Sequence, residues 1–436
     1  MADDASTATT AAVEAPAPSE TKMTVEQTIE KTKSDPRFTR GLALLKEKRY
    51  EEGVAAFEDM LRTMTEVEQE SESLAVAPVY YEYGHALLSL AEVMASVFGN
   101  SAAAEDDGDV EQEARETADD LQVAWEMLEV ARVIYSRFPE ELAVEKELAR
   151  VYMRLGDLGM ESEVFEQAKS DYEKSLMLRK KILKITKDPD TTLLADLYCC
   201  LAISCIYQDT AKTTDAEAEA TSKIQASLSR EEQGMKYYVL AGRVMSENIY
   251  RVAETCPPQL LDFVEQRLPK YSSSLSEDED ATPSKGKGKR KASAMDSSLA
   301  LEYKLDNITS LKDDFLTCVQ VYKSLAGDTK AEGDSTEAAL TKDEAQLLEY
   351  LEIYVELKEK VDGIKESASA ELVGLGGAGA AGKSEQTEDD GAVTTIGFGA
   401  PDATASAPAT APVNLLPVVK KRKITPETGD ENEGSK

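Results

Sequence analysis

The sequence predicts an all-α protein in which helical hairpins stack into a right-handed solenoid with disordered ends. Three observations lead to this class. Apolar residues recur at helical spacing over most of the chain, small residues recur where two helices would touch, and no strand pattern is visible. The 436 residues suffice for one large or two ordinary domains with tails.

The first hairpin is predicted between Asp35 and Met64, in the segment PRFTRGLALLKEKRYEEGVAAFEDMLRTM, with a break near Lys48. Gly41 and Gly53 are twelve positions apart, and Leu44, Tyr50 and Phe57 are the large residues around them. Small residues let two helices approach closely, and large ones fill the space between neighbouring hairpins. This is the spacing of a tetratricopeptide repeat (TPR).

The pattern recurs three times with its two halves further apart. The distance of twelve residues grows to 40, 19 and 32 in the second, third and fourth units. The residues that carry these units are Gly84, Leu87, Ala124, Leu128 and Ala131, then Ala149, Tyr152, Ala168, Tyr172 and Ser175, and then Ala202, Cys205, Gly234, Tyr238 and Ala241. We expect the additional residues to stretch the turns. Stacking four hairpins buries their apolar faces and creates a concave groove, and an irregular helical bundle is the alternative.

The second unit contains an acidic segment, residues 105–120, where its turn is expected. Nine carboxylates face a single basic residue, Arg115, in this segment. The acidic residues are Glu105, Asp106, Asp107, Asp109, Glu111, Glu113, Glu116, Asp119 and Asp120. Unpaired charge of this density does not pack in a core. We therefore predict an acidic loop over about 99–120, solvated or bound to a basic partner.

Composition divides the rest of the chain. Residues 1–33 are predicted to be a disordered leader and residues 34–271 the TPR domain. Residues 272–298, SSSLSEDEDATPSKGKGKRKASAMDSS, form a low-complexity linker, acidic and then basic. Two helical stretches within 299–366 are predicted to cap the solenoid, and residues 367–436 to form a disordered tail.

Charge and cysteine content exclude several classes. The formal charge of −34 argues against direct binding of nucleic acid or an anionic membrane and favours cationic partners. Five cysteines without a CxxC pair indicate reduced thiols in a cytosolic or nuclear protein. The apolar run Leu193 to Tyr207 is too short to span a membrane and contains Asp196, which indicates a buried helix.

No catalytic or cofactor-binding constellation is visible, so the sequence predicts a protein that is not an enzyme and needs no cofactor or metal. The sole histidine, His85, lacks nearby metal ligands and is interpreted as a groove or packing residue. The glycine-rich run 374–382 is low-complexity sequence and follows no strand. The basic run Lys420, Lys421, Arg422 and Lys423 predicts a nuclear import signal read by a transport receptor, with a solubilising charge cluster as the alternative.

The chain resembles the SHNi-TPR histone chaperones. The resemblance is most specific in RLGDLGMESEVFEQAKSDYEKSLMLRKKIL, residues 154–183, and in the order of parts around it. These parts are four repeats, an acidic insertion in the second, a long capping helix and a C-terminal basic cluster. The family implies a nuclear escort of histones H3 and H4, with linker histone bound by some relatives. It also implies transfer to other histone chaperones or to DNA during nucleosome assembly, and leaves open whether a homodimer forms.

The residues suit this role. A flexible polyanion competes with DNA for basic histones, although its attraction is screened beyond about 8 Å at physiological salt. Selectivity is therefore expected from the groove, which TPR proteins line with the first helix of each hairpin. The predicted groove residues are Phe38, Leu42, Tyr81, His85, Arg150, Met153 and Tyr207.

A second hypothesis is a TPR adaptor that grips the C-terminal carboxylate of heat-shock chaperones with a Lys/Asn/Arg clamp. The matching positions here carry Phe38, Leu42, Glu82, Ala143 and Glu147. Acidic and apolar residues repel or ignore a carboxylate, which disfavours this hypothesis. A general assembly scaffold is the remaining alternative.

Overall fold

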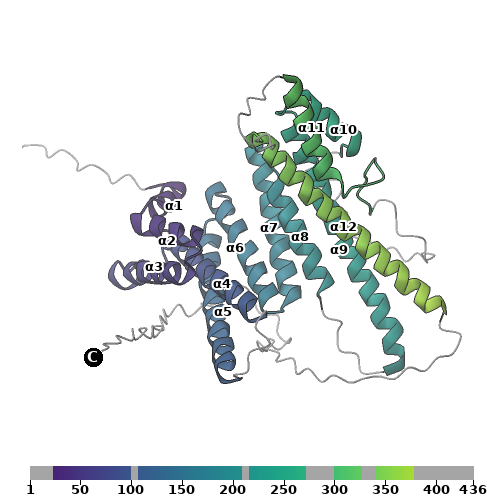
Figure 1. The fold of residues 1–436 in the computed structure, drawn as a ribbon. Coiled ribbons are helices and arrows are strands. Elements are labelled where there is room, and N and C mark those ends of the chain that lie inside the picture. Colours follow the sequence, from purple (N-terminus) through teal and green to yellow (C-terminus); the bar gives the residue numbers. More distant parts are fainter. Residues whose placement is uncertain (1–22, 100–106, 209–215, 272–298, 327–339, 378–436) are drawn as a thin grey trace, which may run out of the picture.

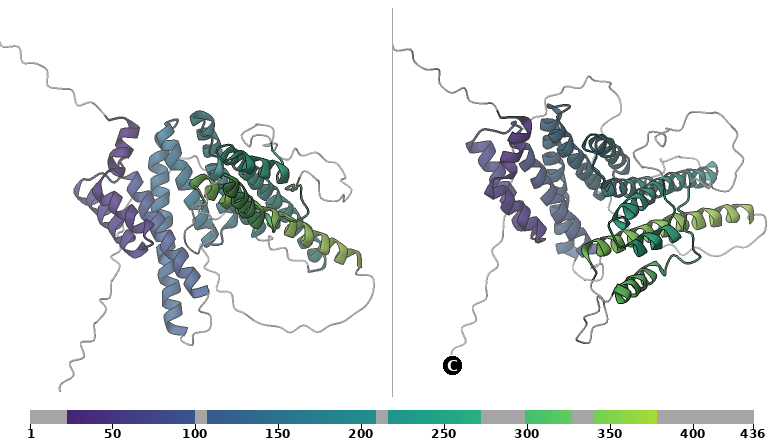
Figure 2. Two further views of the ribbon diagram at one scale, coloured as in Figure 1. Left: turned by 45° about the horizontal axis from the view of Figure 1, so that its top comes forward. Right: turned by 90° about the horizontal axis from the view of Figure 1, so that it is seen from above.

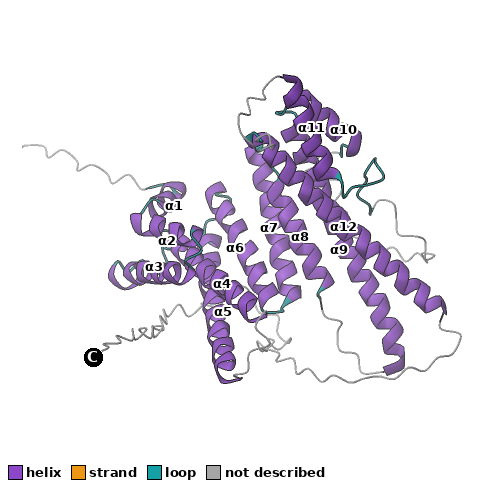
Figure 3. Ribbon diagram, viewed as in Figure 1, coloured by secondary structure: helices purple, strands orange, loops and turns teal. Residues whose placement is uncertain are grey.

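The computed structural model describes residues 23–99, 107–208, 216–271, 299–326 and 340–377, and all regular elements within these ranges are helices (Figures 1 and 3). In chain order they are α1 (Val25–Lys33), α2 (Pro36–Lys46), α3 (Tyr50–Arg62), the π-helix η1 (Thr63–Val67), α4 (Ala77–Gly99), α5 (Asp107–Ser136), α6 (Leu142–Glu161), α7 (Phe165–Thr186), α8 (Thr192–Ile206), α9 (Ala216–Ala253), α10 (Pro258–Arg267), α11 (Leu311–Ala326) and α12 (Lys342–Gly377).

Four antiparallel hairpins follow one another along the chain, α2–α3, α4–α5, α6–α7 and α8–α9. The second helix of each hairpin packs against the first helix of the next, so the hairpins form a continuous stack. Figure 2 shows this order from two further directions, with the N-terminal helices at one end and α12 towards the other. The predicted all-α TPR solenoid is confirmed.

Small residues occur where the helices of a hairpin come closest, as their spacing predicts. A Cβ atom on Gly41 would lie 2.5 Å from the ring of Phe57, and one on Gly84 would lie 2.9 Å from Leu128 and 3.0 Å from the carbonyl of Ala124. These separations are too short for any side chain larger than hydrogen. Glycine at these two positions is therefore needed for the close approach of the helices.

The expectation that additional residues stretch the turns is wrong for the third hairpin. Only residues 162–164 separate α6 from α7, and the added length extends the helices. In the fourth hairpin α9 already begins at Ala216. The segment AEAEATSKIQ is rich in Ala and Glu, which favour helix, and longer helices satisfy more backbone hydrogen bonds than longer loops.

The acidic segment needs the same correction. A loop was predicted to about residue 120, but α4 continues to Gly99 and α5 begins at Asp107. The acidic residues from Asp107 to Asp120 therefore lie on the N-terminal half of a helix rather than in a loop. Glu105 and Asp106 lie outside the described residues.

The leader prediction is wrong for residues 25–33, which form α1. Thr24 and Gln27 make a capping box, in which the Thr24 hydroxyl accepts from the Gln27 amide and the Gln27 side chain accepts from the Thr24 amide. Ile29 and Thr32 are buried against the solenoid. A short polar helix of this kind is stabilised by its cap and by docking, and composition alone does not reveal it.

The C-terminal helices close the other end of the solenoid. The helix α12 packs along α9, while α11 contacts both α10 and α12. The helix α12 continues to Gly377. The prediction of a disordered tail from residue 367 is therefore wrong for residues 367–377, which belong to this helix. The low-complexity linker 272–298, most of the tail and its basic run Lys420 to Lys423 lie outside the described residues.

The buried apolar residues form two clusters. One is built from α1 to α6 and contains Phe38, Phe57 and Tyr135; the other runs from α7 to α12 and contains Leu194 and Tyr354. The division falls inside the third hairpin, and Met153 and Met160 on α6 pack against the second cluster. Among the described residues, none of the helices combines the length and the apolar character that a membrane span requires.

Candidate functional site

The candidate site is the concave surface, which the first helices of the hairpins line in a TPR solenoid. Here these helices are α2, α4, α6 and α8. The helices α4 and α6 contact each other directly, and α1 contacts α2, α4 and α6. Two chemically different areas result, a charged area on α4 and α6 and an apolar area on α8.

The charged area is centred on Arg150 of α6. Its Nη1 donates to Glu147 Oε2 at 2.9 Å, and its Nη2 donates to Glu82 Oε1 at 2.8 Å. Lys33 of α1 donates to the other oxygen of Glu147 at 2.5 Å. Two carboxylates and two cations from α1, α4 and α6 are thus joined in one chain of ion pairs. We call Lys33, Glu82, Glu147 and Arg150 the charged network.

The carboxylates of this network are almost fully enclosed. Glu82 is 2% exposed and Glu147 is 7% exposed. Burial raises the pKa of Glu82, and Arg150 opposes this rise. Burial disfavours the charge on Arg150, but Tyr81, Glu82 and Glu147 outweigh it and raise the pKa of the guanidinium. The pairing therefore keeps Arg150 charged, with its side chain 36% exposed while both carboxylates that it bonds are enclosed.

A second arginine, Arg154, lies one helical turn further along α6. It donates to Asp157 at 2.8 Å, to Glu92 at 3.2 Å and to the hydroxyl of Ser89 at 3.2 Å. The phenol of Tyr172 donates to Asp157 at 2.8 Å. Arg154 thereby connects α4, α6 and α7. Because Arg154 is bonded to these groups, Arg150 is the arginine that pairs with Glu82 and Glu147.

Two aromatic residues of α4 complete the charged area. The rings of Tyr81 and His85 are stacked with centroids 6.0 Å apart and an interplanar angle of 13°. The guanidinium of Arg150 lies 4.3 Å from the centroid of Tyr81, close enough for a cation–π contact. Burial raises the pKa of Tyr81 to about 12.

His85 is neutral at physiological pH. Burial, with Arg154 and Arg150 adding to it, lowers the pKa of His85 to about 3. Its Nδ1 is buried without a hydrogen-bond partner among the described residues. The interpretation as a groove or packing residue fits this environment, since the ring stacks on Tyr81 beside two guanidinium groups.

The apolar area is a stripe along α8, formed by Leu193, Asp196, Cys200, Ile203 and Tyr207 at alternating spacings of three and four residues. Leu193 is 54% exposed and Tyr207 is 63% exposed. Burial raises the pKa of Asp196, the only carboxylate in the stripe, and Arg179 of α7 opposes the rise. We call these five residues the α8 stripe. Leu193, Asp196 and Tyr207 are exposed, while Cys200 and Ile203 between them are half-buried against the core.

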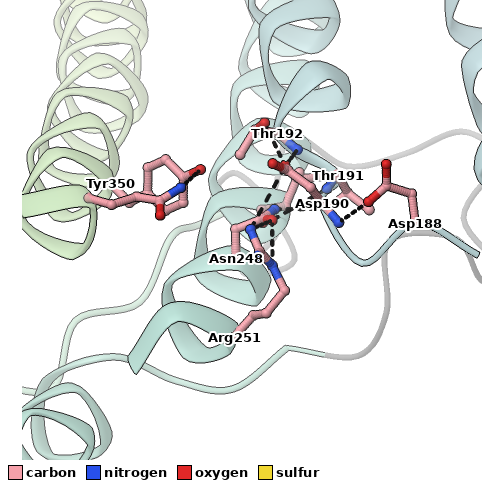
Figure 4. A network of polar contacts seen from close by, with 9 residues as sticks. Asp188, Asp190, Thr191, Thr192, Asn248, Arg251 and Tyr350 are labelled. Carbon is pink, nitrogen blue, oxygen red and sulfur yellow. Dashed lines mark hydrogen bonds and ion pairs between the residues drawn. The ribbon is translucent and has the colours of Figure 1, made fainter. Parts of the chain in front are cut away.

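Polar contacts fix the start of α8 against α9 (Figure 4). Asp190 Oδ1 accepts from the Thr192 amide at 3.0 Å and from its hydroxyl at 2.7 Å, which begins the helix. Asn248 of α9 donates to the hydroxyl of Thr191 at 2.8 Å and accepts from Arg251 at 3.1 Å. The position of the α8 stripe is thus set by buried side chains of the next helix.

The predicted groove residues have different outcomes. Tyr81, His85 and Arg150 come together in the charged area. Leu42 is 38% exposed on α2, and Met153 is partly buried. Tyr207 is exposed, with its ring 6.0 Å from that of Phe165.

Phe38 is not a groove residue. It is 1% exposed and meets Phe57 edge to face, with ring centroids 5.6 Å apart. The residue faces α3, where Phe57 fills the space opened by Gly41, and it contributes to the core of the first hairpin. The groove assignment of Phe38 is therefore wrong.

Sequence reasoning missed two residues of this surface. Lys33 falls in the segment taken as a disordered leader, and its signal is the capping motif from Thr24 to Gln27. Arg154 follows Arg150 by four positions and therefore lies on the same helix face, a spacing that could have identified it. Among the acidic residues, Glu116 and Asp119 are exposed on α5.

The α6–α7 hairpin also contains the segment that matches a known family. Residues 149–186 match the family model SHNi-TPR. The chain is 33% identical over 95 residues to NASP-related protein sim3 of Schizosaccharomyces pombe, covering 21% of this chain and 23% of that protein. It is 36% identical over 66 residues to Protein HGV2 of Halocynthia roretzi, covering 15% of this chain and 13% of that protein. The similarity thus spans less than a quarter of either relative.

Proposed function

We propose that the chain, which belongs to the SHNi-TPR family, is a non-enzymatic histone chaperone that binds histones H3 and H4 in the nucleus. The observation that carries this proposal is the match of residues 149–186 to the family model, because this hairpin supplies Arg150 and Arg154 to the concave surface. Linker histone is a further candidate ligand. The chaperone would shield histones and hand them to other histone chaperones or to DNA for nucleosome assembly.

The concave surface supports a protein ligand of mixed chemistry. Exposed Leu193 and Tyr207 offer apolar contacts, and Asp196 between them offers a carboxylate to a basic side chain. A row of apolar residues along one helix face suits a ligand that presents its own row of anchors. A histone segment with apolar and basic residues on one face has this chemistry.

The acidic segment supports a second contact. It lies at the N-terminal end of α5, where Glu116 and Asp119 are exposed, and its remaining carboxylates continue towards residue 105. Its attraction to histones would be long-ranged, salt-dependent and weakly selective. We therefore assign selectivity to the concave surface and additional affinity to the acidic segment.

The charged network disfavours the heat-shock adaptor. Glu82 and Glu147 occupy two of the positions where such adaptors carry a carboxylate clamp, and both are bonded to Arg150. A C-terminal carboxylate entering this area would meet two carboxylates whose cations are already engaged. Nuclear import through the run Lys420 to Lys423 remains part of the proposal, and its replacement by alanine should move the protein towards the cytoplasm.

Titrations of the full chain with purified H3–H4 and H2A–H2B complexes over a salt series test the proposal. We expect tight binding that favours H3–H4. Deletion of residues 100–119 should weaken it more at low salt than at high salt, because the removed contact is electrostatic. A second variant keeps the length and replaces only the acidic residues of this segment with Gln, which removes the charge but still favours the helix that begins at Asp107. Equal, salt-sensitive binding of both complexes would contradict a specific chaperone.

A further inference from the structure

The helix α1 lies against the concave surface. It contacts α4 and α6, which follow it at a distance in the sequence, as well as the neighbouring α2. Ile29 is buried in the N-terminal core cluster, and the hydroxyl of Thr32 donates to the carbonyl of Ala75 at 2.9 Å. Its last residue, Lys33, reaches Glu147 at 2.5 Å. A helix from outside the four hairpins thus occupies part of the surface proposed to bind histone.

Lys33 balances the charge of the network. Glu82 and Glu147 carry two negative charges, and Arg150 supplies one positive charge to both of them. Arg154 is bonded to Glu92 and Asp157 instead. If Lys33 leaves, two enclosed carboxylates share a single guanidinium, which is costly in a site with little water. The area then requires one replacement cation.

The attachment of α1 is slight compared with that of the hairpins. It has nine residues, and only Ile29 and Thr32 are buried. Ser34 and Asp35 connect it to α2, and Asp35 caps the start of α2 by accepting from the Arg37 amide. The N-terminal turns of α1 can therefore detach while this cap and the first hairpin stay in place. A helix this short does not persist when detached, and elements with few buried contacts are the first to open. Opening of α1 would expose Glu147.

We propose that α1 is an internal competitor that a basic segment of the bound histone displaces, providing a lysine or arginine to Glu147 in place of Lys33. This inference rests on the proposed function and adds regulation to it. Histone binds only the molecules in which α1 is detached, so the apparent affinity is the intrinsic affinity multiplied by the detached fraction. It also rejects ligands that bring no cation, because only a cation restores the charge balance.

Three single variants of the full chain test the proposal in titrations with purified H3–H4 complex. Lys33→Met keeps the aliphatic stem but removes the cation, and should raise affinity about fivefold by weakening the competitor. Lys31→Met is the matched control, since Lys31 is exposed on the same helix, and should leave affinity unchanged. Glu147→Gln also loosens α1 but removes the acceptor, and should bind no more tightly than wild type.

Hydrogen exchange reports the displacement directly. Amides of residues 25–33 should lose protection when H3–H4 binds, while those of α4 and α6 keep theirs. Tight binding with unchanged protection of α1 would overturn the displacement and leave the proposed function standing. An equal gain of affinity in Lys33→Met and Glu147→Gln would overturn the exchange of cations at Glu147. Failure of the wild-type chain to bind H3–H4 would overturn both proposals.

Discussion

The two areas of the concave surface differ in what their side chains can do. In the charged network, Glu82 and Glu147 are 2% and 7% exposed and already have cationic partners. In the α8 stripe, Leu193 and Tyr207 are 54% and 63% exposed. The first helices of successive hairpins therefore carry enclosed carboxylates in ion pairs in one area and exposed apolar side chains in the other.

This difference separates stability from recognition. Breaking an enclosed ion pair leaves a charge without its partner, so changes in the charged network should act mainly on folding. Exposed apolar side chains contribute little to folding, but they lose water contact when a ligand covers them. Changes in the α8 stripe should act mainly on binding.

Arg150→Met should have the largest effect, a loss of about 3–5 kcal/mol in the free energy of unfolding, because Glu82 and Glu147 lose their shared guanidinium. Denaturant unfolding at pH 7.5 measures this loss. The pKa of Glu82 is already raised by burial, so part of the stability should return at lower pH, where this carboxyl becomes neutral.

Arg137→Met is the matched control for this change. Arg137 pairs with Glu72 at 3.2 Å, but the two side chains are 42% and 57% exposed. An exposed pair of this kind contributes less than about 1 kcal/mol. An equal loss of stability in the two variants would show that enclosing the carboxylates of the charged network does not increase the contribution of their ion pairs to the free energy of unfolding.

His85 should make stability depend on pH. Its pKa is about 3 in the folded chain and near 6.5 when unfolded, so the unfolded state binds more protons between these values. Stability should therefore fall as pH is lowered through 6.5, by about 1.4 kcal/mol between pH 7.5 and pH 5.5. His85→Phe retains a ring against Tyr81 and should lose this part of the pH dependence.

Denaturant unfolding of both proteins at the two pH values measures the histidine contribution. Carboxylates titrate in wild type and variant alike, so the difference between the two pH responses isolates His85. Identical responses would mean that the ring is hydrated or protonated in the folded chain, which would contradict the enclosure of the charged area.

The sequence revealed the parts of this surface that depend on local spacing. Gly41 with Phe57 and Gly84 with Leu128 established the hairpins, because close helix contacts demand small residues at fixed intervals. The same register brought Tyr81, His85 and Arg150 onto neighbouring helices. It failed at Phe38, since a helix has several inward positions and only packing decides which of them face the partner helix.

Other features depend on contacts between distant segments. Lys33 meets Glu147 across 114 positions of the chain, and no local pattern announces such a pair. The acidic segment was misjudged for another reason. Its charge excludes it from a core, but solvated helices are also charged, so composition could not distinguish a loop from the N-terminal half of α5.

Tyr207→Ser tests the α8 stripe and should have the smallest effect on folding. The side chain is 63% exposed, so the free energy of unfolding should change by less than about 0.5 kcal/mol. Affinity for H3–H4 should fall about fivefold, or by about 1 kcal/mol, because an aromatic anchor is removed from the proposed binding surface. Val67→Ser is the control, because Val67 ends η1 and is 76% exposed. It should change neither the free energy of unfolding nor the affinity. If Tyr207→Ser loses stability but not affinity, the roles of the two areas are reversed. The α8 stripe would then support the fold, and binding would have to be explained by the charged network.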